Sequence, residues 1–541
     1  MKATKSLTTA IALLAVVSLA GCGTRIGGDP EPSEAPSSAA TGTAGPSAGT
    51  PGGGGGAVPG LEKYYGQKVS WGSCDEMTAA DDIDPDAYDR TKLECGRVTV
   101  PVDYNDPGEG ETKLAVARTK ATGKRQGSLL MNPGGPGGSG VQQVAAKTTE
   151  LGNLAVAQSF DLVGWDPRGV GASSPAVKCY SDQQRDENRK STLANDNSPE
   201  GIVKQEDFNR DLANLCEEKM GKTFLEHVGT ADTVRDLDVL RAVLGDEKLT
   251  YLGYSYGTFI GAIYAETFPE RVRAMVLDGA VDPAEDPIAS SVQQMAGFQT
   301  VFEDFAKDCA SRPDCALGQD PAQATARYHQ LVRPLIDKPV RGQGGRMLSY
   351  SDATTGTIQA MYAKQLWDPL RRGLANLARG DGALMQRLAD VYLNRDERGR
   401  YSPMMDANTA INCVDSPAVT DPAEVARKDT EIRKAAPFLD DGRGTGRAAK
   451  DACSFWPAAP TLKPHEVNAV GAPKTVVVST THDPATPYEN GVNLAKQLNA
   501  SLISFEGSQH TVSLEGNPCV DDAVTAYLRD LTPPAEGLRC T

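Results

Sequence analysis

The chain has 541 residues, with 71 acidic and 55 basic side chains and a formal net charge of −16. Its length allows several folding units, and 39% hydrophobic with 23% charged residues excludes a disordered chain or a coiled coil. The acidic balance argues against nucleic acid or an anionic membrane surface as a partner, because both repel negative charge. Eleven cysteines, none in a C-x-x-C pair, favour disulfides over zinc.

Residues 1–21 have the pattern of a signal peptide. Lys2 and Lys5 precede an apolar stretch, residues 7–19, that is too short for a comfortable membrane span. The ending Leu-Ala-Gly-Cys is similar to a bacterial lipobox, which implies that Cys22 is lipidated; the alternative is ordinary cleavage that leaves this thiol free. We therefore expect an exported protein on the outer face of the cell membrane, attached by its lipid alone or shed from it.

Residues 22–60 have the composition of a flexible tether, since 32 of these 39 residues are Gly, Pro, Ser, Thr or Ala. Such a segment buries too little apolar surface to fold. From about residue 70, apolar runs alternate with helical stretches, which predicts a mostly parallel α/β sheet. The expected strands are residues 96–102, 113–118, 127–131, 160–165, 248–253, 273–278, 474–479 and 501–505.

The strand pattern stops after residue 278 and resumes near residue 474. Between these points the chain is mainly helical in pattern. We expect one α/β domain built from residues 61–285 and 460–541, interrupted by a helical insertion over residues 286–459. Such an insertion between two strands of a sheet is suited to cap a site at the sheet edge.

Residues 253–257 read Gly-Tyr-Ser-Tyr-Gly, a G-x-S-x-G motif centred on Ser255. The motif alone is weak, but here it follows a predicted strand and opens a predicted helix, which is the context of a nucleophile elbow. An ordinary Gly-Ser turn is the alternative. The context makes Ser255 the candidate nucleophile.

A serine nucleophile needs a histidine base and an orienting carboxylate. Asp483 and His510 each come just after a predicted strand, where the sites of α/β proteins lie. Of the five histidines, only His510 follows the last predicted strand. Asp483 is the preferred acid, and Asp278, after the preceding strand, is the alternative.

The glycine-rich loop at residues 132–140 follows another predicted strand. Its glycines allow close approach to a reacting carbonyl, so the N–H groups of Gly135 and Tyr256 are the candidate oxyanion donors. The loop also contains a literal G-x-G-x-x-G, but Pro136 lacks an N–H and an exported protein meets little nicotinamide cofactor. A flexible turn without function is a third possibility.

These motifs, in this order, resemble the secreted tripeptidyl aminopeptidases of actinobacteria, which are α/β-hydrolases related to prolyl aminopeptidases. The shared set comprises N-P-G-G-P-G-G-S-G, D-P-R-G-V-G, G-Y-S-Y-G, D-P-A-T-P and a C-terminal Gln-His. The resemblance implies an α/β-hydrolase fold with a large helical cap, and a Ser255–Asp483–His510 triad. Pro133 stands where prolyl aminopeptidases have histidine in their H-G-G-P-G motif, which favours the tripeptidyl branch.

The resemblance implies peptide substrates with a free N-terminus and no cofactor or metal. An aminopeptidase must also bind a protonated amine, for which Asp415 in the insertion is the candidate carboxylate; a solvated loop aspartate is the alternative. Two other functions stay open: a carboxylesterase or lipase with the same triad, and a catalytically silent binding protein on this fold. Without Cys22, ten cysteines remain, and we expect neighbours to pair: 74–95, 179–216, 309–315, 413–453 and 519–540.

Overall fold

The computed structural model describes residues 60–75, 77, 93–152 and 154–541. Within this part, one sheet contains nine strands in the order β1-β2-β4-β3-β5-β6-β9-β10-β11. Strand β2 is antiparallel to both β1 and β4, and the pairs from β4 to β11 are parallel. The strands are β1 Leu93–Pro101, β2 Glu111–Thr119, β3 Gly127–Asn132, β4 Phe160–Asp166, β5 Leu249–Tyr254, β6 Val272–Asp278, β9 Val476–Thr480, β10 Ser501–Phe505 and β11 Arg539–Cys540.

All eight expected strands are present, and their ends agree with the expected ends to within three residues. Three short strands escaped the sequence pattern, namely β11 and the hairpin formed by β7 Val340–Arg341 and β8 Met347–Leu348. Each of these has only two residues. A segment of that length shows no alternation of apolar and polar residues, which is the signal on which strand prediction depends.

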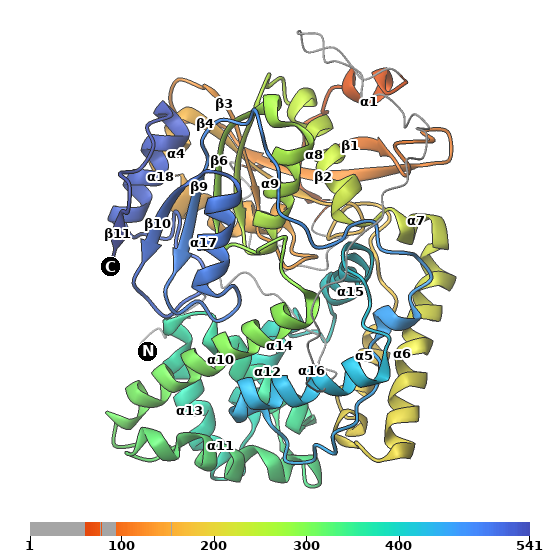
Figure 1. Cartoon of the computed structure of the whole chain (residues 1–541), viewed down its shortest axis with the longest axis vertical. Helices are drawn as coiled ribbons and strands as arrows, with labels where there is room; N and C mark the ends of the chain where they lie inside the picture. Colours follow the sequence, from red (N-terminus) through yellow and green to blue (C-terminus); the bar gives the residue numbers. More distant parts are fainter. Residues whose placement is uncertain (1–59, 76, 78–92, 153) are drawn as a thin grey trace, which may run out of the picture.

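Helices cover both faces of the sheet (Figure 1). Consecutive residues of the central strands point to opposite faces, so Leu129 and Leu130 belong to different apolar clusters. One cluster includes helices α3 Gly140–Leu151, α4 Val156–Ser159 and α18 Pro518–Asp530, and the other includes α8 Thr230–Val243, α9 Tyr256–Thr267 and α17 Tyr488–Gln497. Because both faces are covered, the central strands β3, β4, β5 and β9 are buried at every residue.

The segment between β6 and β9 folds as a largely helical layer beneath the sheet (Figure 1). Its helices are α10 Pro287–Ala310, α11 Ala324–Val332, α12 Tyr350–Met361, α13 Trp367–Leu377, α14 Ala383–Tyr392, α15 Met404–Asp415 and α16 Pro422–Ala435. This layer has an apolar core of its own, in which the rings of Phe302 and Phe438 stack with centroids 4.5 Å apart. Among the described helices, none combines the length and apolar character that a membrane span requires.

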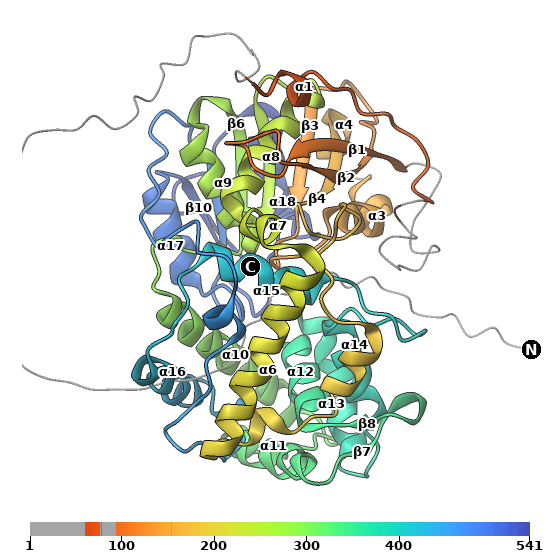
Figure 2. The ribbon, with the colours of Figure 1, turned by 90° about the vertical axis from the view of Figure 1, so that its right-hand side faces the viewer.

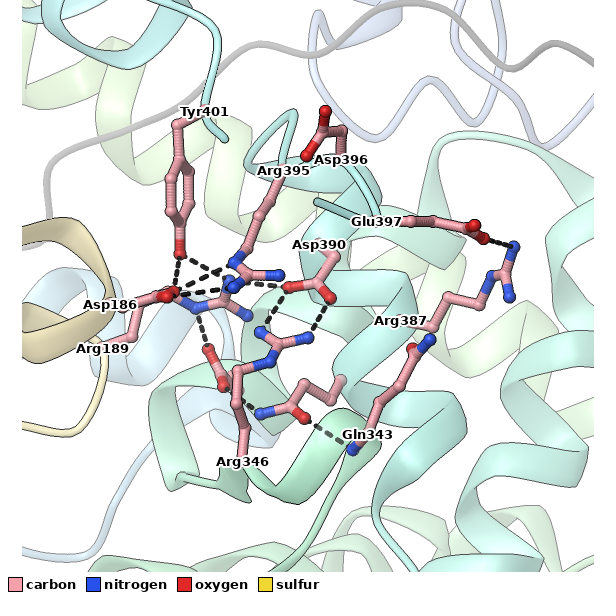
Figure 3. A network of polar contacts seen from close by, with 12 residues as sticks. Asp186, Arg189, Gln343, Arg346, Arg387, Asp390, Arg395, Asp396, Glu397 and Tyr401 are labelled. Carbon is pink, nitrogen blue, oxygen red and sulfur yellow. Dashed lines mark hydrogen bonds and ion pairs between the residues drawn. The ribbon is translucent and has the colours of Figure 1, made fainter. Parts of the chain in front are cut away.

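A second segment, between β4 and β5, packs against the same helical layer. It contains α5 Asp182–Asn188, α6 Pro199–Met220 and α7 Lys222–Glu226, and Figure 2 shows α6 running alongside the insertion. Arg189, just after α5, pairs with Asp352 at 2.8 Å and with Asp390 at 2.7 Å (Figure 3). The layer that covers the edge of the sheet therefore contains segments that precede β5 in the sequence and segments that follow it.

Five disulfides join the ten cysteines of the described residues, and their pairing is the expected one. The bond between Cys413 and Cys453 links α15 to the chain that returns toward the sheet. The first 59 residues, with Cys22, lie outside the described residues.

Candidate active site

Ser255 occupies a sharp turn between β5 and α9. Its backbone has φ +53° and ψ −125°, a region that residues other than glycine rarely adopt. Its N–H donates a hydrogen bond to the carbonyl oxygen of Asp278 at 2.8 Å, which ties the turn to the end of β6. The serine thus stands at the N-terminus of α9, where the helix dipole favours developing negative charge.

The two glycines of the motif are required by close backbone packing. A Cβ on Gly253 would lie 2.3 Å from the carbonyl oxygen of Gly257, and a Cβ on Gly257 would lie 2.7 Å from that of Asn132. Both distances are shorter than van der Waals contact. The turn therefore excludes side chains at both positions, which explains the motif in physical terms.

The imidazole of His510 is held by Asp483. Its Nδ1 atom donates to the two carboxylate oxygens of Asp483 at 2.8 and 2.9 Å, and the N–H groups of Ala485 and Thr486 donate to the same carboxylate. Burial lowers the pKa of His510, but the charge and hydrogen bonds of Asp483 outweigh burial, so the pKa is raised overall. Within the described residues, Nε2 of His510 has no hydrogen-bond partner. That nitrogen is placed to accept a proton.

Asp278, the alternative acid, has a different environment. Its Oδ2 atom accepts hydrogen bonds from the N–H groups of Val512 and Ser513 at 2.8 and 2.5 Å, and burial raises its pKa to about 6. It therefore holds the backbone just after His510, whereas Asp483 holds the imidazole.

The glycine-rich loop after β3 lies against the start of α9. A Cβ on Gly134 would lie 2.7 Å from the amide nitrogen of Tyr256 and 3.0 Å from Cβ of Ser255. Among the described residues, the N–H of the next residue, Gly135, meets no hydrogen-bond acceptor. This arrangement is suited to an oxyanion hole with donors from the loop and the helix.

Helix α15 of the insertion supports this loop. The amide of Asn408 donates to the carbonyl oxygen of Pro136 at 3.0 Å, and Asn412 in turn donates to Asn408 at 3.0 Å. Asn408 is buried. The insertion therefore contacts the glycine-rich loop directly.

A cavity of about 250 Å³ is lined in part by Ser255. Its wall brings together Ser255, Gly135, Tyr256, Asp415 and Thr486, which come from the loop after β3, the elbow, the insertion and the loop after β9. Within the described residues, no cluster of three or more His, Cys, Asp or Glu side chains is arranged to hold a metal ion.

A family profile described as alpha/beta hydrolase fold matches residues 127–517. The chain belongs to the α/β-hydrolase family. This agrees with the mostly parallel sheet, the elbow at Ser255 and the order of the motifs along the chain.

Three curated relatives cover most of this α/β-hydrolase. Serine protease Hip1 of Mycobacterium tuberculosis is 49% identical over 88% of the chain and 92% of its own length. Carboxylesterase B of the same organism is 50% identical over 90% of the chain and 92% of its own length. Tripeptidyl aminopeptidase of Streptomyces lividans is 32% identical over 83% of the chain and 83% of its own length. The resemblance to tripeptidyl aminopeptidases is confirmed, and the chain is an enzyme, a hydrolase of the serine peptidase family.

Asp415 is buried at the C-terminal end of α15 in this α/β-hydrolase, so the alternative of a solvated loop aspartate is wrong. Its Oδ1 atom accepts the N–H of Thr230 at 2.8 Å, and its Oδ2 atom accepts the hydroxyl of Tyr256. Burial raises its pKa to about 6. The disulfide at Cys413 anchors the helix end that carries it.

Glu285 is a second carboxylate in the cavity wall, and the sequence did not single it out. Its Oε2 atom accepts a hydrogen bond from Asn490 at 3.3 Å, while Oε1 has no partner among the described residues. Burial raises its pKa to about 6. In the sequence it is one of several acidic residues between β6 and α10, and nothing there distinguishes it from an exposed side chain.

Proposed function

We propose that this α/β-hydrolase is an exported serine exopeptidase that releases short peptides, namely tripeptides, from free N-termini through an acyl-enzyme. The observation that supports it most is the pairing of His510 with Asp483, which leaves Nε2 of the histidine without a partner among the described residues. Asp278 ties the turn at Ser255 to the segment that follows His510. Ser255, His510 and Asp483 fill the roles of nucleophile, base and orienting acid.

The geometry supports a two-step acyl transfer. Nε2 of His510 takes the proton of Ser255 as Oγ attacks the substrate carbonyl carbon, and the oxyanion receives hydrogen bonds from the N–H groups of Gly135 and Tyr256. The imidazolium then gives its proton to the leaving amine, and the peptide C–N bond breaks. Water, deprotonated by the same nitrogen, releases the acyl peptide and restores Ser255.

Recognition of a free N-terminus needs a carboxylate at the far end of the bound segment. We assign this role to Asp415, because it lines the cavity beside Tyr256 and each of its oxygens has capacity for a further hydrogen bond. Glu285 lines the same cavity, and we assign it a supporting role in binding the amine. The helical layer limits how much peptide enters, which favours an exopeptidase over an endopeptidase.

Export and anchoring are part of the proposal. Five disulfides are typical of proteins in oxidising compartments. We propose residues 1–21 as a signal peptide, Cys22 as the lipidated residue, 22–60 as a tether, 61–285 with 460–541 as the catalytic core, and 286–459 as the cap.

A paired substrate assay tests this function. The enzyme is expected to cleave Ala-Ala-Ala-p-nitroanilide and to reject its N-acetylated form, and Ser255→Ala is expected to abolish the reaction. Equal rates on the free and the acetylated anilide would contradict amine recognition. A fluorophosphonate probe that labels the wild type and Ser255→Ala alike would contradict the nucleophile.

The relative named carboxylesterase B keeps an esterase as the second candidate. A short-chain p-nitrophenyl ester distinguishes the two, because an esterase would hydrolyse it faster than any free tripeptide anilide.

A further inference from the structure

Lys428 is a buried ammonium group in the wall of the catalytic cavity. It lies on α16, where Val425, Lys428 and Ile432 form the buried side of the helix, and it is only 6% exposed. The apolar neighbours on this side are ordinary core residues. A lysine is rarely buried at such a position unless its charge has a partner.

Among the residues that the structure describes, no carboxylate lies within ion-pair distance of the Lys428 ammonium group. Among the described residues, Lys428 forms neither an ion pair nor a hydrogen bond. The two carboxylates whose charge reaches it, Asp451 and Asp286, are each bound to backbone N–H groups at the start of a helix. Burial lowers the pKa of Lys428 and these two charges only oppose that effect.

An unpaired buried charge is costly, and a protein keeps one where a partner arrives from outside. Lys428 shares its cavity with Ser255, Glu285 and Asp415. The cavity wall therefore holds carboxylates that can bind an amine and, in Lys428, a buried lysine that can bind an anion. A neutral peptide would leave this ammonium group without a direct ion-pair partner among the described residues.

We propose that Lys428 binds a carboxylate of the substrate, so that the enzyme selects peptides with an acidic side chain in the segment that enters the cavity. This inference rests on the proposed peptidase function and names its substrate class. The ligand is zwitterionic: its protonated N-terminus meets the carboxylates, and its aspartate or glutamate side chain meets Lys428.

Binding to an inactive enzyme tests the proposal without turnover. In Ser255→Ala, calorimetry compares tri-alanine peptides in which each position in turn is Glu or Gln. We expect the Glu peptide to bind about tenfold more tightly than the Gln peptide at one position, the gain typical of a charge pair shielded from water. Lys428→Met in the same background is expected to remove the difference, and Lys428→Arg to keep it.

Lys463 provides the matched control, because it lines the same cavity but is exposed. Lys463→Met is expected to leave the Glu preference unchanged. The proposal is overturned if Glu and Gln peptides behave alike at all three positions, including no binding of either, or if Lys428→Met retains the preference. Cleavage of Ala-Ala-Ala-p-nitroanilide by the wild type reports separately on the proposed function. If the enzyme cleaves this substrate but shows no preference for Glu, the peptidase function stands and only the proposal for Lys428 is overturned.

Discussion

Asp278 binds the backbone of Ser255 through its carbonyl oxygen, at 2.8 Å, while its carboxylate binds the backbone that follows His510. One residue at the end of β6 thus ties together the segments that carry the proposed nucleophile and the proposed base, which are 255 residues apart in the sequence. Because a displacement of about 1 Å can cost 100-fold in rate, such a shared support is as important as the reacting groups.

The two buried aspartates are expected to differ in their effect on catalysis. Asp483→Asn removes the partner that orients the imidazole, and we expect kcat to fall about 10³- to 10⁴-fold. Asp278→Asn leaves the imidazole with Asp483, but its neutral amide oxygen accepts the two backbone N–H groups less strongly than the carboxylate oxygen that binds both, and a loss of about 10-fold is expected. Steady-state kinetics on the tripeptide anilide measure both. A larger loss of kcat in Asp278→Asn than in Asp483→Asn would show that Asp278 is the acid of the triad.

The pH profile should report the raised pKa of His510. Because the base acts only when neutral, kcat/KM is expected to fall as the pH drops through a value above the ordinary 6.5. The charge of Asp278 contributes to this rise, so Asp278→Asn should move the acidic limb to lower pH. If the acidic limb of the kcat/KM profile is at the same pH in Asp278→Asn and in the wild type, the charge of Asp278 does not affect the pKa of His510.

Asp415 and Glu285 are expected to act on KM for peptides with a free amine. A carboxyl with a pKa of about 6 loses its charge below that pH, so KM should rise as the pH falls through about 6. Asp415→Asn is expected to raise KM about 10-fold or more, with a smaller effect from Glu285→Gln.

Tyr256→Phe is the control for this prediction. It removes the hydroxyl that bonds to Asp415 but keeps the carboxylate and the backbone N–H. It should leave amine recognition intact, so an equal rise in KM in Tyr256→Phe and Asp415→Asn would show that Asp415 only positions the tyrosine. A short ester, which lacks the amine, should be insensitive to Glu285→Gln.

Arg189 is expected to be a main contributor to the stability of the cap. Its side chain, 11% exposed, bridges Asp352 and Asp390 and also donates to the hydroxyl of Tyr401 at 2.9 Å (Figure 3). Arg189→Met leaves two buried carboxylates with fewer partners and should lower the free energy of unfolding by about 3 kcal/mol.

The neighbouring pair of Lys190 and Glu187 serves as the control, since both side chains are exposed. Lys190→Met should change the free energy of unfolding by about 0.5 kcal/mol or less. Urea denaturation followed by fluorescence measures both variants. Equal urea midpoints in Arg189→Met and Lys190→Met would show that the buried network stabilises the protein no more than the surface pair does.

The sequence predicted the strands, the elbow at Ser255 and the pairing of neighbouring cysteines, because each depends on residues close together in the chain. Asp483 and His510 could also be placed, since each follows a recognisable strand and parallel strands end at one edge of the sheet. The role of Asp278 could not be read in this way. Its position after β6 fits an acid as well as a support, and only the contacts at His510 distinguish the two.

The composition of the cavity was decided by tertiary structure alone. Glu285 lies in an acidic stretch and Lys428 in a helix with many charged residues, and both look like surface residues in the sequence. They line one cavity with Ser255 because the insertion folds back over the edge of the sheet, where Lys428 is buried and Glu285 is half-buried. Burial and the absence of a partner are properties of three-dimensional packing, whereas local sequence patterns report only which side of a helix or strand is apolar.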